Sequence, residues 1–245
     1  MLTLGIDLAA SPKRTAVCEI LWADGKASVV SWAPQARDDK LLALIGRADK
    51  AGIDVPLGWP VGFVAALTSY GPGGPWVPTD TENLRLRATD RFVRERTGIT
   101  PLTVSADKIA APAMRAAALL TAYSSENGTV DRTGRGKVVE VYPAAALRLW
   151  GFRHTCYKGK KRGAERAQLI ESFRRATIWL EPDAGLYSAC ESDDNAFDSL
   201  IAALVARAAA IGLTSPVPLE LEDLAAHEGW IAIPAEMTLG SLART

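Results

Sequence analysis

The fold is decided by residues 2–33, which read LTLGIDLAASPKRTAVCEILWADGKASVVSWA. Three apolar runs lie in this stretch, at 2–8, 15–22 and 27–32, and each has the length and composition of a strand. A Ser-Pro turn follows the first run, and Asp24-Gly25 between the other two is typical of a tight hairpin. The stretch therefore predicts a three-stranded antiparallel meander.

A helix and further strands follow the meander. Residues 38–48 carry apolar side chains at helical spacing, and residues 52–55 form a short strand that a proline ends. A strand that returns after a helix usually lies parallel to the first strand through a right-handed crossover. We also expect a strand at 137–142, a long apolar helix at 193–211 and an edge strand at 229–234. The predicted fold class is α/β, with a mixed sheet flanked by helices.

The length and composition bound the architecture. The chain has 245 residues, 48% of them hydrophobic, which suffices for one large α/β core. No repeat or break in composition marks a second domain. We therefore expect a single domain over residues 1–245, with an irregular and helical insertion at about 57–135. Within the insertion, residues 70–76 predict a loop, and residues 79–97 and 107–123 predict helices.

Charge and cysteine content exclude several classes of protein. Lys and Arg together number 28, as do Asp and Glu, and this balance argues against a strong nonspecific nucleic-acid binder. The three cysteines are far apart, so they predict neither a disulfide framework nor a zinc site. The chain shows no signal peptide and no apolar run of about 18 residues that could span a membrane. We therefore expect a cytoplasmic protein.

Acidic residues in or beside the predicted strands are the most informative functional feature. Asp7 and Asp54 end two strands, Glu140 lies within a third, and Asp194 and Asp198 begin the long helix. An ionised carboxylate out of water costs several kcal/mol unless a cation or donor compensates it. Several such residues in one domain predict a divalent metal, and Mg²⁺ or Mn²⁺ suits carboxylate oxygens.

Each of these acids also has a structural explanation. Asp7 and Asp54 could begin turns, and Glu140 could pair with an arginine. The acids that begin the long helix could cap it, with the last of them on the surface. Together these explanations require coincidence, whereas one metal site accounts for all of the acids. The sequence thus predicts catalytic and metal-binding roles for Asp7, Asp54, Glu140, Asp194 and Asp198.

Two basic stretches could bind substrate phosphates. One lies in the 79–97 helix, where two arginines are four residues apart on one face. The other is the segment 153–162, which interleaves basic side chains with an aromatic one. Both could instead pair with nearby acids or remain solvated. The candidate substrate-binding residues are Arg87, Arg91, Lys158, Lys160 and Lys161.

The motifs, taken in order, resemble the DUF429 family, described as predicted nucleases of the ribonuclease-H-like fold. The pieces that carry the resemblance are Gly5-Ile6-Asp7, Ile53-Asp54-Val55-Pro56-Leu57-Gly58, Arg87-Ala88-Thr89-Asp90-Arg91, Glu140-Val141-Tyr142-Pro143, Asp194-Asn195-Ala196-Phe197-Asp198-Ser199-Leu200 and Glu228-Gly229-Trp230-Ile231. They span residues 5 to about 234. No single piece is specific, and their order and content together carry the resemblance.

The resemblance implies a two-metal nuclease site. Asp7 matches the central ligand on the first strand, Asp54 the acid that ends the fourth strand, and Asp194 and Asp198 the acids of the terminal helix. Glu140 matches a strand motif whose role as a ligand is less defined. The implied partner is nucleic acid, with DNA and RNA both open. The oligomeric state is open as well, with a dimer among the options.

Two other functions use the same residues differently. One is an ATP-binding phosphotransferase of the actin and sugar-kinase class, which would need a glycine-rich phosphate loop after a strand. The Gly73-Gly74 pair lies between prolines instead. The other is a non-catalytic binding module that retains the acidic residues without activity.

Overall fold

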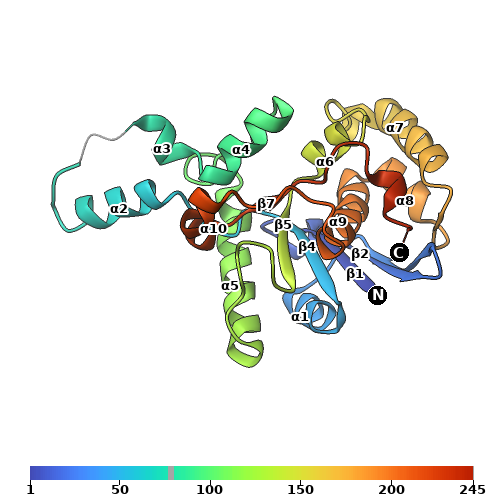
Figure 1. Ribbon diagram of the computed structural model, residues 1–245, viewed down its shortest axis with the longest axis horizontal. Helices are drawn as coiled ribbons and strands as arrows, with labels where there is room; N and C mark the ends of the chain where they lie inside the picture. Colours follow the sequence, from blue (N-terminus) through green and yellow to red (C-terminus); the bar gives the residue numbers. More distant parts are fainter. Residues whose placement is uncertain (77–79, 245) are drawn as a thin grey trace.

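The computed structural model describes residues 1–76 and 80–244, and its centre is a seven-stranded mixed sheet (Figure 1). The strands are β1 (Leu2–Asp7), β2 (Ala16–Ala23), β3 (Lys26–Ala33), β4 (Lys50–Asp54), β5 (Val138–Val141), β6 (Leu180–Glu181) and β7 (Ile231–Ala232). The α-helices are α1 (Asp38–Arg47), α2 (Val61–Tyr70), α3 (Thr81–Arg85), α4 (Ala88–Thr97), α5 (Ala110–Asn127), α6 (Pro143–Leu149), α7 (Gly163–Ala176), α8 (Leu186–Ser192), α9 (Asp194–Ala210) and α10 (Glu222–Glu228).

The sheet has the order β6-β3-β2-β1-β4-β5-β7. Strands β1, β2 and β3 pair antiparallel, as the meander predicted, and β4 lies parallel to β1. Strand β5 continues the parallel part, and β7 is the edge strand expected near the C-terminus. The predicted α/β class and the mixed sheet flanked by helices are confirmed. The short strand β6, which extends the sheet beside β3, was not predicted.

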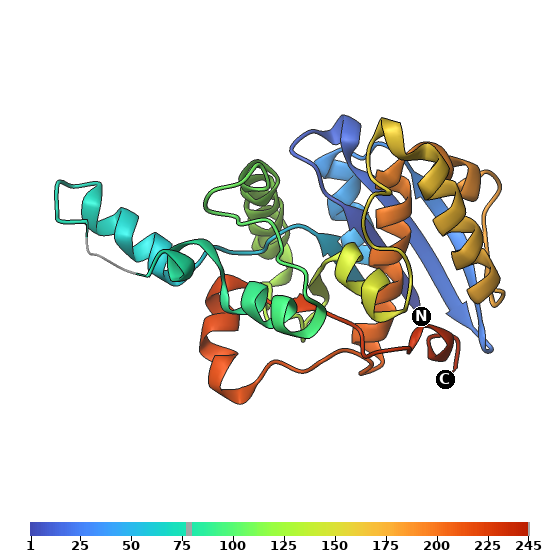
Figure 2. The ribbon, with the colours of Figure 1, turned by 90° about the horizontal axis from the view of Figure 1, so that it is seen from above.

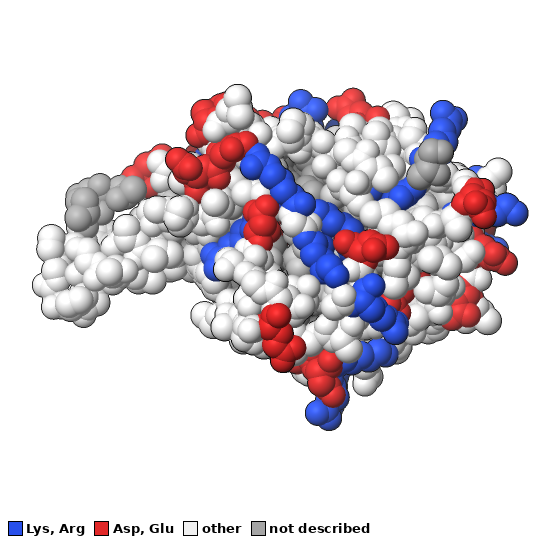
Figure 3. Space-filling model, turned by 60° about the horizontal axis from the view of Figure 1, so that its bottom comes forward, with Lys and Arg blue, Asp and Glu red and all other residues white. Residues whose placement is uncertain are grey.

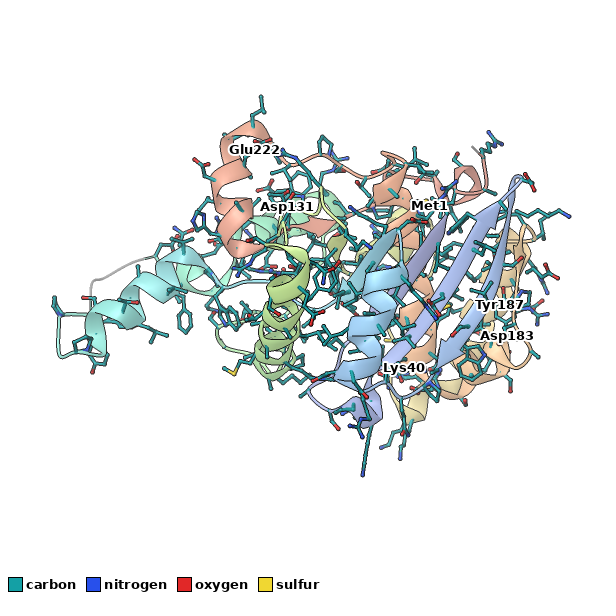
Figure 4. All side chains as sticks on the ribbon, turned by 90° about the horizontal axis from the view of Figure 1, so that it is seen from below. Met1, Lys40, Asp131, Asp183, Tyr187 and Glu222 are labelled. Atoms are coloured by element: carbon teal, nitrogen blue, oxygen red, sulfur yellow. The ribbon has the colours of Figure 1, made fainter. Side chains whose placement is uncertain are left out.

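Helices cover both faces of the sheet. On one face α1 and α5 pack on Leu4, Ile6 and Ile53 (Figure 4). On the other face α9 lies along β1, β2 and β4, and α6, α7 and α8 pack around it (Figure 2). The two cores follow from the alternation of side chains along each strand. The long helix predicted at 193–211 is α9, and it is buried over most of its length.

The insertion contains more helix than the sequence predicted. Helix α2 lies in a stretch expected to be irregular, and it projects with α3 from the body of the molecule (Figure 1). The helix expected at 79–97 is divided into α3 and α4, because Leu86 is extended and Asp90 accepts a hydrogen bond from the Arg87 N–H to cap α4. Residue 79 lies outside the described residues.

The projecting arm and the body differ in charge. On the face shown in Figure 3, the part of the arm that α2 forms is free of Lys, Arg, Asp and Glu side chains, whereas both signs are mixed over the body. Val64, Leu67 and Tyr70 of α2 are about half exposed. In the described part of the chain, none of the helices combines the length and the apolar character needed to cross a membrane.

Candidate functional site

Asp7 and Asp54 lie side by side at the ends of two neighbouring strands. They are partners in the parallel register of β1 and β4, and each is the last residue of its strand. Registered partners on adjacent strands are about 4.8 Å apart and point to the same face. The carboxyl ends of parallel strands are where open α/β sheets place ligands. The pair therefore stands where the sequence predicted a site.

Two glycines let helix α9 approach the sheet on the face that these aspartates share. A Cβ on Gly5 would collide with the backbone of Ser199 and Ala203, and one on Gly52 would lie 2.5 Å from the Ala202 carbonyl oxygen. Glycine is the residue that permits such close contact between helix and strand. Asp7 and Asp54 follow the glycines by two residues, so they point to the same face, beyond the first turns of α9.

Asp194 and Asp198 begin α9, but their environments differ. The Asp193 side chain caps the helix by accepting a hydrogen bond from the Asn195 N–H at 3.0 Å. Asp198, one turn further along, has only 1% of its side chain exposed and faces the sheet. Asp194 is 25% exposed. The capping explanation therefore holds for Asp193, whereas Asp198 is not a surface residue.

A loop between α6 and α7 supplies two partners to Asp198. The Tyr157 hydroxyl donates to Asp198 Oδ1 at 2.8 Å, and Lys158 Nζ lies 2.5 Å from Oδ2. Cys156 and Gly159, on either side, have positive φ angles of 58° and 89° and turn the loop around this pair. The Gly159 N–H also donates to Asp194 Oδ1 at 3.1 Å. We call Asp7, Asp54, Asp194 and Asp198 the acid cluster.

The acid cluster carries more negative than positive charge. Burial raises the pKa of Asp7 well above its ordinary value, and the charges of Asp54 and Asp198 raise it further. Burial also raises the pKa of Asp54, to about 7, although Lys158 opposes the rise. The pKa of Asp198 is raised by burial and lowered in part by Lys158. These mutual effects indicate that the acids are close enough to repel one another.

Two cations face this cluster: Lys158 pairs with Asp198, and the buried Arg166 lies 3.8 Å from Asp194 Oδ1. Lys158 is the one that acts on the three innermost acids, Asp7, Asp54 and Asp198. Burial lowers its pKa, but the charges of Asp198, Tyr157, Asp54 and Asp7 outweigh that effect and raise the pKa well above its ordinary value. Its side chain is 48% exposed, whereas Asp198 is almost fully covered. The stem of Lys158 is therefore at the surface, and its ammonium group points inward.

Glu140 points away from the acid cluster. It pairs in register with Ile53, whereas Gly52 pairs with Val139, so Glu140 lies on the face opposite to Asp54. Arg87 binds both of its oxygens, with Nη1–Oε2 at 2.8 Å and Nη2–Oε1 at 2.7 Å. The alternative of a salt bridge to an arginine is thus what the structure contains, and we leave Glu140 out of the ligand set proposed below.

The ion pair belongs to a larger buried network. Arg87 also binds both oxygens of Asp90, and its Nη1 donates to the Glu228 carbonyl oxygen. The Glu228 carboxylate accepts the Val61 N–H at 2.9 Å and the Ala88 N–H at 2.6 Å, at the starts of α2 and α4. We call Arg87, Asp90, Glu140 and Glu228 the Arg87 network. It joins α2, α4 and α10 to the sheet.

The other predicted substrate-binding residues differ in position. Arg87 is buried and held by its ion pairs with Glu140 and Asp90, and it lines the pocket beside Asp54 that is described below. Arg91 donates to Asn83 and to the Leu86 carbonyl oxygen, away from the acids. Lys160 and Lys161 are exposed in a short turn that follows Lys158. Of the five, Lys158 contacts the acid cluster, and Lys160 and Lys161 follow it in the chain.

A pocket of about 110 Å³ opens beside Asp54 and Lys158. Tyr142, Leu102 and Ile109 form part of its wall. Within residues 1–76 and 80–244, no group of three or more His, Cys, Asp or Glu side chains is already arranged around a metal position. The ammonium group of Lys158 stands against Asp198.

Sequence reasoning missed two residues that shape the site. Tyr157 was not distinguished from other aromatics, because nothing in its neighbourhood predicts a partner 41 positions away. Arg166 is buried and donates to the carbonyl oxygens of Tyr157, Glu191 and Ser192, so it fastens the loop to the end of α8. An arginine at an apolar helical position, between Gly163 and Leu169, was the only available indication.

One of three comparisons with known proteins found a match. The searches of curated proteins and of solved structures gave no match. A family model described as a protein of unknown function, DUF429, matches residues 5–223. That stretch includes the acid cluster, Lys158 and Glu140, whereas Glu228 lies beyond it. Since the match covers most of its length, the chain belongs to the DUF429 family.

Proposed function

We propose that this protein is a metal-dependent nuclease, which uses Mg²⁺ or Mn²⁺ to hydrolyse phosphodiester bonds of DNA or RNA. The order of elements supports a ribonuclease-H-like fold for it: an antiparallel meander, a helix, two parallel strands and a terminal helix against the sheet. The buried cysteines Cys18 and Cys190 are free thiols, in keeping with a cytoplasmic location.

One observation carries the proposal. Asp7, Asp54 and Asp198 converge from two strands and a helix; the charges of Asp54 and Asp198 raise the pKa of Asp7, and the charge of Asp198 raises the pKa of Asp54. Within the described residues, Lys158 is the single cation that forms an ion pair with any of the three. A purely structural cluster would be expected to balance its buried charges. Three carboxyl groups with one paired cation support a cationic ligand.

The side chains present suit a hard divalent cation. Carboxylate oxygens are the ligands that Mg²⁺ and Mn²⁺ prefer, and Asp7 and Asp54 accept no hydrogen bond from the described residues that would occupy their oxygens. Asp7, Asp54 and Asp198 would hold the metal, with Asp194 beside them. When bound, such ions lower the pKa of an attacking water and stabilise the leaving oxygen of a phosphodiester.

Other residues near the site would orient the metal ligands and bind the nucleic acid. Tyr157 fixes the Asp198 carboxylate, and burial together with Asp198 raises the pKa of Tyr157, which keeps its hydroxyl a donor. Lys160 and Lys161 present positive charge beside the site, where a phosphate backbone could be neutralised. The pocket next to Asp54 offers room for part of a nucleotide.

The decisive experiment combines metal binding with activity. Mn²⁺ binding is measured by calorimetry, and hydrolysis is screened on single strands, duplexes, RNA–DNA hybrids and junctions. Asp7→Asn should abolish detectable Mn²⁺ binding. It should also lower turnover about a thousandfold, because a metal contributes several kcal/mol to the transition state and each 1.36 kcal/mol is tenfold in rate.

Asp39→Asn is the matched control, since Asp39 is an exposed acid whose partner is Arg37 at the surface. It should leave metal binding and turnover unchanged. Wild-type protein that binds no Mn²⁺, or Asp7→Asn that binds it equally well, would overturn the proposal. Binding of ATP in the same calorimeter would favour the phosphotransferase, and binding of nucleic acid without hydrolysis would favour the binding module.

A further inference from the structure

Lys158 is bound to the acids that the proposed metal would need. Its Nζ lies 2.5 Å from Asp198 Oδ2, and the charges of Asp54 and Asp7 also act on it. Among the described residues it is the cation that pairs with Asp7, Asp54 or Asp198, since Arg166 pairs with Asp194 instead. A divalent ion would repel an ammonium group at such short range. Lys158 and a divalent cation are therefore alternatives in this site.

The side chain of Lys158 can turn outward while the residues on either side of it stay in place. Its stem is half exposed, so the ammonium group can turn outward without unpacking a core. Tyr157 remains anchored, because it is buried and its carbonyl oxygen accepts from Arg166 at 2.9 Å. Gly159, the next residue, is held as well, because its N–H donates to Asp194 Oδ1 and its carbonyl oxygen accepts from Arg166. The movement is therefore confined to the side chain of Lys158.

We propose that Lys158 is the built-in counter-ion of the metal-free protein, and that a divalent metal displaces it toward the phosphate of the substrate. This inference rests on the proposed function. An ammonium group released beside the site binds phosphate as a point charge. Metal binding would thereby create a phosphate-binding group, so that the two ligands strengthen each other's binding.

The test compares Mn²⁺ affinities by calorimetry for the wild type, Lys158→Met and Lys160→Met. Removal of the competing charge should tighten Mn²⁺ binding by about tenfold or more in Lys158→Met. Lys160→Met removes the same charge from the same loop without a contact to Asp198, and its dissociation constant should change by less than about twofold. Lys158→Arg retains the charge and should bind Mn²⁺ about as the wild type does.

The outcomes separate this inference from the proposed function. If Lys158→Met binds Mn²⁺ no more tightly than the wild type, the counter-ion role is wrong even where Asp7→Asn abolishes binding. If neither the wild type nor Lys158→Met binds Mn²⁺, both proposals fail. Circular dichroism establishes that each variant is folded. If Lys158→Met is unfolded, Lys158→Gln takes its place, with the same tightening expected.

The second half of the inference has its own measurement. Fluorescence anisotropy of a labelled single-stranded oligonucleotide, with and without Ca²⁺, reports how the metal changes affinity for phosphates. In the wild type, Ca²⁺ should tighten binding about fivefold or more. In Lys158→Met, that increase should be clearly smaller than in Lys160→Met. An equal increase in the two variants would show that Lys158 does not reach the substrate.

Discussion

The acid cluster and the Arg87 network hold the same kinds of side chain, yet they differ in how well their charges are satisfied. In the network, Arg87 spans Glu140 and Asp90 with five hydrogen bonds from its N–H groups, and Glu228 receives two backbone N–H groups. In the acid cluster, Lys158 pairs with Asp198 and Arg166 lies near Asp194, whereas Asp7 and Asp54 form no ion pair among the described residues.

This difference shows how buried acids of two kinds can be told apart. Burial alone does not distinguish them, since both sets lie against the sheet. The number of hydrogen-bond donors around each carboxylate distinguishes them. A carboxylate whose oxygens all accept hydrogen bonds holds elements together, whereas one with free oxygens can bind a ligand. Glu140 connects the insertion to the sheet, whereas Asp7 and Asp54 are residues that we propose to bind the metal.

The largest expected effect comes from breaking the Arg87 network. Arg87→Met would leave Glu140 and Asp90 buried without a cation, and the free energy of unfolding should fall by about 3–5 kcal/mol. Urea denaturation followed by circular dichroism measures the change. Arg91→Met is the control on the same helix and should cost less than about 1.5 kcal/mol. An equal fall in the free energy of unfolding for the two variants would show that Arg87 is no more important to stability than Arg91.

A matched pair of substitutions sharpens the comparison, because the same chemical change should have opposite signs. In metal-free buffer at pH 7.5, Glu140→Gln should lower the free energy of unfolding by about 2 kcal/mol, since an amide cannot accept from Arg87 with both of its groups. Asp54→Asn should raise it by on the order of 2 kcal/mol, since it removes repulsion with Asp198 and a costly buried charge. Destabilisation by both variants would argue that Asp54 is structural.

The free energy of unfolding should also depend on pH through Asp54. Asp54 has a folded pKa of about 7 against an ordinary value of 3.8, so between these values the folded protein binds more protons than the unfolded one. Its contribution to stability is therefore lost as pH rises through this range. Between pH 5.5 and 7.5, the wild type should lose about 2 kcal/mol relative to Asp54→Asn.

Thermal melts of the two metal-free proteins over that pH range measure this loss. Mn²⁺ should bind more weakly at pH 5.5, because it must displace a proton from Asp54. A difference between wild type and Asp54→Asn that stays constant over the range would contradict the raised pKa.

Much of the sheet could be predicted because its elements are encoded locally. The alternation of residues 2–33, the Asp24-Gly25 hairpin and the proline that ends β4 fix strands through short-range chemistry. Helix α2 escaped prediction because its apolar residues, such as Val64 and Leu67, lie on an exposed arm and do not show the periodicity of a helix on a core.

The sequence by itself determined which acids stand at strand ends, and so it identified Asp7 and Asp54 as neighbours through their parallel strands. Only the tertiary structure decided that Glu140 pairs with Arg87 and that Lys158 pairs with Asp198. A register shifted by one residue turns a side chain to the other face of a sheet, and a loop contact between residues 158 and 198 leaves no periodic trace in the chain. Whether a buried charge is balanced depends on its distance from other charged groups, and tertiary packing sets those distances.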